Sequence, residues 1–133
     1  MVPSEGEKTE KITINMGLID LGQIDLLVQE GFYTNRTDFI RTAIRAQLAA
    51  RSEAVDQTTA RRTLTLGSCH YSRRDLEEIR EAGQIIHIQV LGLASIAADV
   101  SPQLALATIA SVEVLGAFRA PAAVKAALAA RIV

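Results

Sequence analysis

The chain has 133 residues, of which 49% are hydrophobic and 4% aromatic, and its formal net charge is −1 at pH 7. Because the charge is nearly balanced, the chain as a whole is not a polycation, and any nucleic-acid binding must come from a local arrangement of donors. With a single cysteine, the chain is not expected to form an internal disulfide. It shows no signal pattern at its start and no long unbroken apolar stretch, so we expect a cytoplasmic protein without a membrane span.

The chain begins with a polar segment that contains glycine and proline, and we expect residues 1–9 to be a disordered tail. Polar and apolar residues then alternate. One face of this stretch carries Lys11, Thr13 and Asn15, and the other carries Ile12, Ile14 and Met16. A period of two with isoleucine and threonine predicts a half-buried strand.

Two amphipathic helices are predicted after this strand. The first begins near Leu18 and ends before Gly31, which suits the left-handed position that follows a helix. Asn35 is a good N-cap for the second helix, and Asp38 places a carboxylate in its first turn. The second helix runs to about residue 51, and residues 52–62 either extend it or form a linker.

The second half of the chain contains an internal repeat. The pairs Leu66-Gly67, Leu91-Gly92 and Leu115-Gly116 recur about every 24–25 residues, and a helix start signal follows each pair. A strand, a glycine turn and a helix, repeated three times, predict parallel strands with helices packed against them. We therefore expect an α+β chain in which residues 10–51 form one domain and residues 63–133 form a small α/β domain.

A single strand followed by two helices cannot bury its own apolar face. Antiparallel pairing of two copies of the strand would give a dimer whose core contains Ile12, Ile14, Met16, Phe39, Ile40 and Ile44. The polar face of this two-stranded ribbon, with Lys11, Thr13 and Asn15 from both copies, suits the major groove of double-stranded DNA. The start of the second helix, at Asn35, Arg36 and Thr37, offers free N–H groups and a positive dipole end to a phosphate.

These segments resemble a known family. The strand Lys11–Met16, the helix that ends at Gly31 and the run Gly31–Arg41 are similar to the CopG-type ribbon-helix-helix transcriptional regulators, over about residues 8–50. The resemblance implies that the three outward strand residues contact bases and that the start of the second helix contacts phosphate. It implies a homodimeric repressor. We expect the C-terminal repeats either to join dimers into tetramers or larger arrays, or to bind a partner or an effector.

Other interpretations were weighed against this one. Cys69, His70 and His87 are weak candidates for metal ligands, because the repeat register places the two histidines at different ends of neighbouring strands. No cofactor is expected, and no spacing typical of an enzyme stands out. Arg41 and Arg45 are expected on a solvated helix face. The alternative function is an oligomeric scaffold that uses the ribbon-helix-helix unit only to dimerise.

Overall fold

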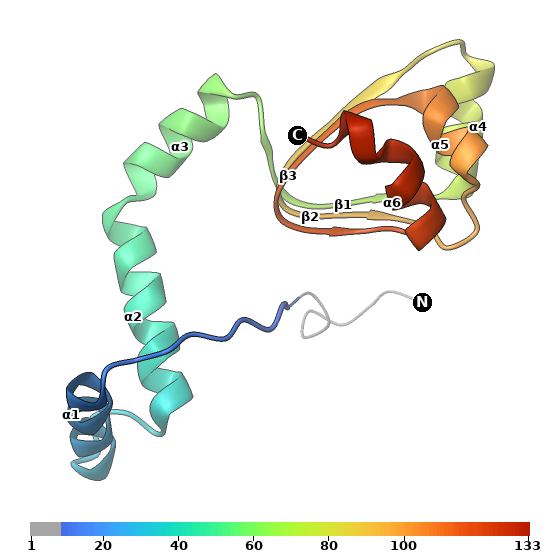
Figure 1. Cartoon of the computed structure of the whole chain (residues 1–133). Coiled ribbons are helices and arrows are strands. Elements are labelled where there is room, and N and C mark those ends of the chain that lie inside the picture. Colours follow the sequence, from blue (N-terminus) through green and yellow to red (C-terminus); the bar gives the residue numbers. More distant parts are fainter. Residues whose placement is uncertain (1–8) are drawn as a thin grey trace. The chain divides into compact units, whose positions relative to one another are not determined.

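The computed structural model describes residues 9–133, so most of the segment expected to be a disordered tail, residues 1–8, lies outside the described residues. The described chain forms two compact units, which we call the N-terminal unit (Thr9–Thr58) and the C-terminal unit (Thr59–Val133). Helices and strands are both present, which confirms the α+β class. Figure 1 shows the elements of each unit.

The N-terminal unit is built from helices α1 (Leu18–Gln29) and α2 (Arg36–Ala50). Gly31 ends the first helix in the left-handed conformation, with φ of 84°. Its N–H donates to the carbonyl of Val28, and the N–H of Phe32 donates to that of Leu27, which is the pattern of a Schellman motif. The predicted helix end at Gly31 is therefore confirmed.

A third helix, α3 (Ser52–Arg61), follows α2 after a break of one residue at Arg51. The N–H of Arg51 donates to the carbonyl of Leu48, which ends α2. The segment for which the sequence left a linker or an extension open is thus mostly helical, and the boundary between the two compact units falls within it.

The C-terminal unit alternates strands and helices. Its elements are β1 (Thr65–Tyr71), α4 (Arg73–Glu81), β2 (Ile86–Ile96), α5 (Pro102–Thr108), β3 (Ile109–Arg119), α6 (Ala122–Leu128) and a final 3-10 turn, η2 (Ala129–Arg131). The three strands form one parallel sheet in the order β1-β2-β3. This confirms the predicted repeat of strand and helix.

The three repeated glycines lie side by side across the sheet. Gly67 is paired with Gly92, and Gly92 with Gly116, and all three have φ between 118° and 139°. A Cβ atom on Gly92 would meet the carbonyl oxygen of Gly67, so the strands approach too closely for a side chain. The glycines, for which the sequence allowed a turn, a bend or a close approach of the backbone, form bends, because each strand continues beyond its glycine; the curved strands are visible in Figure 1.

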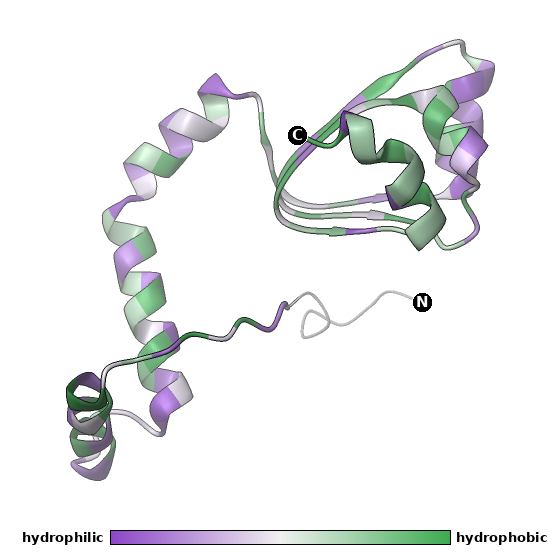
Figure 2. Ribbon diagram, viewed as in Figure 1, coloured by the Kyte–Doolittle hydropathy of each residue, from purple (hydrophilic) through white to green (hydrophobic). Residues whose placement is uncertain are grey.

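The core of the C-terminal unit lies between the sheet and its helices. Its fully buried large side chains are Leu76, Ile88, Val90, Thr108, Ile109, Val112, Val124 and Leu128. Figure 2 shows the hydrophobic residues along the strands and on α6. Serine side chains cap the N-termini of two of the helices. The hydroxyl oxygen of Ser72 accepts from the N–H of Asp75, and that of Ser101 accepts from the N–H of Leu104. These start signals were correctly predicted.

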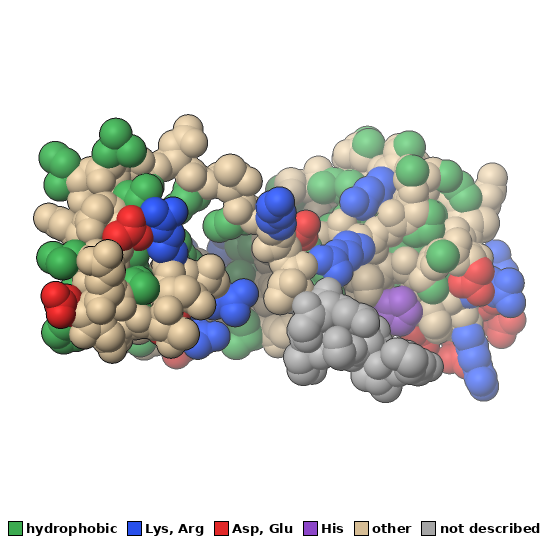
Figure 3. Space-filling view, turned by 90° about the horizontal axis from the view of Figure 1, so that it is seen from below, with side chains coloured by type: hydrophobic (Ala, Val, Ile, Leu, Met, Phe, Trp, Pro, Cys, Tyr) green, Lys and Arg blue, Asp and Glu red, His purple; other side chains and the backbone are tan. Residues whose placement is uncertain are grey.

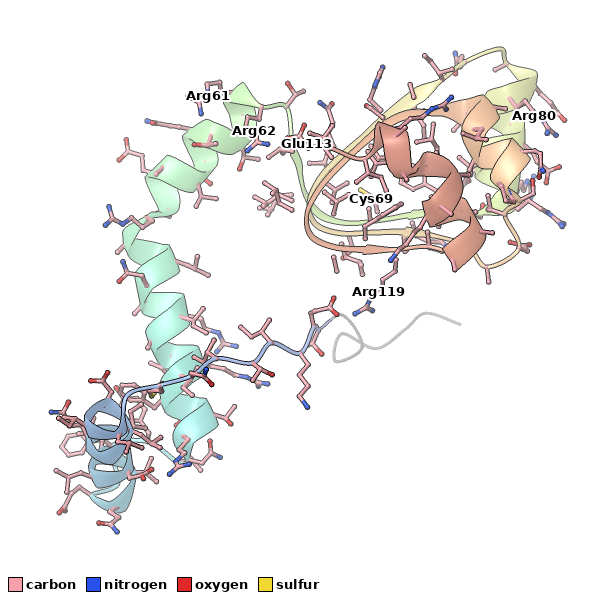
Figure 4. All side chains as sticks on the ribbon, viewed as in Figure 1. Arg61, Arg62, Cys69, Arg80, Glu113 and Arg119 are labelled. Carbon is pink, nitrogen blue, oxygen red and sulfur yellow. The ribbon has the colours of Figure 1, made fainter. Side chains whose placement is uncertain are left out.

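The end of the chain closes over β3. The guanidinium of Arg131 donates to the carbonyls of Leu106 and Ile109 at 2.8 and 2.7 Å. The N–H of Val133 donates to the carbonyl of Val112 at 2.8 Å. On the same strand, Glu113 forms an ion pair with Arg62, and Figure 4 shows these two side chains pointing toward each other.

Candidate nucleic-acid interface

The segment predicted as a strand is exposed in the single chain. Residues 9–17 form neither helix nor strand there, and Ile12 and Ile14 are 73% and 61% exposed. The polar residues of the pattern, Lys11, Thr13 and Asn15, are also exposed. A β-ladder for this segment needs a second strand, so the ribbon stays a prediction.

An apolar hollow lies next to this segment. It has a volume of about 350 Å³ and is lined by Met16, Asp20, Gln23, Ile24, Leu27 and Phe39. Among the other residues predicted for the dimer core, Ile40 is half-buried and Ile44 is 47% exposed. The hollow therefore lies where the sequence predicts that a second copy packs.

The N-terminal unit has very little interior of its own. Within residues 9–58, Ile24 is the one buried hydrophobic residue. The large hydrophobic residues left exposed are Ile12, Ile14, Leu18, Ile19, Leu26, Phe32, Ile44, Leu48 and Val55. Figure 3 shows hydrophobic side chains on the surface of this unit. Exposed apolar surface on this scale marks an interaction site.

The start of α2 is held by local hydrogen bonds. The side chain of Asn35 accepts from the Asp38 N–H at 2.8 Å, and the carboxylate of Asp38 accepts from the Thr34 N–H at 2.9 Å. Asn35 is therefore an N-cap, as predicted from the sequence, and the N–H groups of Arg36 and Thr37 begin the helix behind it.

Arg36 forms a two-point contact with Asp25 of α1. Its Nε and Nη2 atoms donate to the two carboxylate oxygens at 2.7 and 2.8 Å. The hydrogen bond from Arg36 holds the pKa of Asp25 below its ordinary value, and the same bond raises the pKa of Arg36. Both side chains are about half exposed, so the pair links the two helices at the surface.

A polar hollow opens at the start of α2. It has a volume of about 350 Å³ and is lined by Thr34, Asn35, Thr37, Asp38, Arg41 and Arg45. The two arginines lie four residues apart, which places them on one face of α2 directly after its N-terminus. The sequence predicted that both arginines lie on a solvated face, but it did not predict that they lie together with the start of α2. The spacing of four residues from Thr37 to Arg41 to Arg45 is the sequence signal that places the three side chains on one face.

The chain was compared with known proteins. Residues 7–125 match the model of the Ribbon-Helix-Helix transcriptional regulator family. The chain belongs to this family. No curated protein and no solved structure matches it. The match extends far beyond the segment of about residues 8–50 on which the resemblance rested, and it covers most of the C-terminal unit.

Membership makes the chain a transcriptional regulator that binds DNA, and regulators of this kind typically bind it as dimers. It also disfavours the scaffold interpretation. The alternating segment, the apolar hollow and the start of α2 all lie in the N-terminal unit.

The candidate metal ligands lie in the C-terminal unit of this ribbon-helix-helix protein. His70 shares a hydrogen bond of 2.7 Å with Ser95, and His87 shares one of 2.7 Å with Ser111. The two histidines lie near opposite ends of neighbouring strands, as the repeat register predicted, and Cys69 is half-buried. Within residues 9–133, no three residues of metal-binding type are grouped.

The arginines at the start of α4 are paired with carboxylates. Arg73 lies 3.2 Å from Glu77 and 3.8 Å from Asp99, and Arg74 lies 3.3 Å from Glu78. They therefore form exposed ion pairs rather than an anion site. None of the helices in the described part of the chain has the length and hydropathy needed to cross a membrane.

Proposed function

We propose that this protein is a sequence-specific repressor of the CopG type, which binds double-stranded DNA as a homodimer through a two-stranded antiparallel ribbon. The observation that carries the proposal is the exposed, alternating segment at residues 11–16, next to an apolar hollow in a unit with one buried hydrophobic residue. Pairing of two such segments would cover Ile12 and Ile14.

Base contacts are assigned to the polar face of the ribbon. Lys11 would donate to the acceptors of guanine, Asn15 would pair with adenine, and Thr13 would contact a thymine methyl or an acceptor. The pattern supports this assignment because all three side chains are exposed and lie on the face opposite the isoleucines.

Phosphate contacts are assigned to the start of α2. The N–H groups at this helix end and the positive end of the dipole favour an anion, and Asn35 and Thr37 lie at the polar hollow. Arg41 and Arg45 line the same hollow and would supply the charge. Arg36 would approach the phosphate while held by Asp25, so the ion pair would orient its guanidinium.

The C-terminal unit would join ribbon dimers. Binding of two dimers to neighbouring half-sites raises the affinity of the assembly above that of either dimer, without new contacts to DNA. This assignment is supported by the ordered sheet of the C-terminal unit, which has a core of its own.

The test is binding to DNA fragments from upstream of the gene that encodes this chain, across a series of salt concentrations. Lys11→Ala and Asn15→Ala should each weaken specific binding by about 1–3 kcal/mol and relax the sequence preference. Arg41→Ala should weaken binding to all sequences and reduce the salt slope by about 1.

Arg80→Ala, in the last turn of α4, is the matched control and should leave binding unchanged. If the Lys11 and Asn15 variants bind the same fragments with the same affinity and preference as the wild-type protein, the ribbon does not read the bases and the proposal is wrong.

A further inference from the structure

Strand β1 is an edge strand without the features that usually protect such an edge. Within the described residues its one strand neighbour is β2. Its sequence, TLGSCHY, contains no charged residue and no proline, and its first four residues are exposed. Unprotected edges of this kind pair readily with another strand.

The other edge of the sheet is different. β3 carries Glu113 and Arg119, and the carbonyl of Val112 already accepts the N–H of Val133. Ile132 forms an isolated bridge to Val112 at the same place. Among residues 9–133, the C-terminal unit therefore has one edge partly covered by its own chain and one edge, that of β1, which no other strand covers; we call it the bare edge.

The backbone of β1 has groups that point away from β2. The carbonyl of Tyr71 accepts the N–H of Ala97, so Tyr71 directs its backbone groups toward the β2 side of the sheet. In a parallel ladder alternate residues bond to the same neighbour. It follows that Leu66, Ser68 and His70 direct their N–H and C=O groups to the bare edge.

We propose that β1 pairs with the β1 strand of a second copy in antiparallel orientation and thereby joins two ribbon dimers into a closed tetramer. This inference rests on the proposed function only in its assumption of a ribbon dimer. The β1 edges of the two copies are related by a two-fold axis, so pairing covers the bare edge of both C-terminal units. Because β3 is partly covered and charged, each C-terminal unit has one strand partner, and the tetramer closes when both β1 strands of one ribbon dimer pair with both β1 strands of a second.

Charge on the neighbouring helix favours the antiparallel orientation. The first turn of α4 carries Arg73, Arg74 and Asp75 and is net positive, whereas the rest of the helix carries Glu77, Glu78, Glu81 and Arg80 and is net negative. A two-fold axis beside β1 also reverses α4, so the arginines of one copy lie toward the glutamates of the other. Unlike charges then face each other, and a parallel arrangement would lose this complementarity.

The test measures the number of copies in the full-length protein by sedimentation velocity. Lysine at an edge strand blocks pairing, so Ser68→Lys should convert four copies to two. Ala117→Lys is the matched control, because Ser68, Leu93 and Ala117 share one register row; it should leave four copies. Ile14→Glu, on the apolar side of the ribbon, should also give two copies, and Ile14→Glu with Ser68→Lys should give one.

These outcomes separate the two interfaces. If Ser68→Lys has the size of the wild-type protein and Ile14→Glu is a monomer, the β1 contact does not exist and the inference is wrong. If Ser68→Lys is a monomer and Ile14→Glu is a dimer, the β1 contact stands and the ribbon dimer does not. Filaments of the wild-type protein would contradict the closed pairing.

A cross-linking measurement covers the case in which the lysine variant fails to fold. In a background of Cys69→Ser, a short bismaleimide should link two chains that carry Ser68→Cys and should leave chains that carry Ala117→Cys unlinked. Equal linking of both variants, or linking of neither, would overturn the assignment of the contact to β1.

Discussion

The C-terminal unit buries the side chains of Leu76 and Leu128 completely, whereas the N-terminal unit buries Ile24 and leaves Phe32 and Leu48 more than half exposed. The C-terminal unit therefore has the interior that an independently folding domain needs. The N-terminal unit has only part of a core, which the proposed second copy would complete. Under this proposal, one chain combines a part that is stable by itself with a part whose stability depends on its partner.

This difference explains the division of roles. A surface that must pair with its own copy can present the same side chains twice, related by symmetry, and such a dimer suits a DNA site that is itself two-fold symmetric. A unit with a closed core can hold dimers together without taking part in base contacts.

The largest effect is expected at the glycine row of the C-terminal unit. Gly92→Ala places a Cβ atom against the carbonyl of Gly67 at a φ of 139°, and we expect it to destabilise this unit by about 3 kcal/mol. The measurement is calorimetric unfolding of the full chain.

Gly22→Ala in α1 is the control, since nothing lies within 4 Å of its Cβ position, and it should stabilise the N-terminal unit by about 0.5–1 kcal/mol. A destabilisation by Gly22→Ala as large as that by Gly92→Ala would contradict the account.

In the Ser68→Lys protein, which lacks the proposed β1 contact, dilution should affect the N-terminal unit alone. A tenfold dilution lowers the stability of a dimer that unfolds on dissociation by about 1.4 kcal/mol, whereas a unit with its own core keeps its unfolding temperature. Two transitions are expected in calorimetry, one that moves with protein concentration and one that does not. If neither moves, the N-terminal unit does not depend on a partner.

The smallest effect concerns the pair of Arg36 and Asp25. Because the pKa of Asp25 is lowered in the folded chain, its contribution to stability is present above the ordinary value of 3.8 and is lost as the pH falls through the lower folded value. Asp25→Asn should therefore flatten the loss of stability below about pH 4. The measurement is urea unfolding of the N-terminal unit within the full chain across this range, and Asp56→Asn in α3, which lines neither hollow, is the control. An unchanged pH profile in Asp25→Asn would show that the pair contributes nothing to folding.

The architecture of the C-terminal unit could be predicted from the sequence because its signals are local. Leu-Gly pairs recur at nearly constant spacing, and parallel strands in register place the equivalent residues Gly67, Gly92 and Gly116 side by side. The strand ends could not be predicted in the same way. A glycine with positive φ within a bent strand looks, in sequence, like a glycine that ends it.

At the candidate site, local reasoning found the cap but not the contacts between helices. Asn35 followed by Asp38 is a sequence signal, and both side chains act as caps. The pairing of Arg36 with Asp25 joins residues eleven positions apart on two helices, which only packing brings together. Arg41 and Arg45 were placed on the correct helix, but their position at the polar hollow depends on the loop before α2.

The most direct test of the central claim is an isotope-filtered nuclear Overhauser measurement on a mixture of labelled and unlabelled chains. The account predicts contacts between the residue 11–16 segments of two chains, with Ile12 and Ile14 facing the helices and Lys11, Thr13 and Asn15 remaining accessible to solvent. Residues 11–16 without contacts to a second chain, or polar side chains covered by protein, would contradict it.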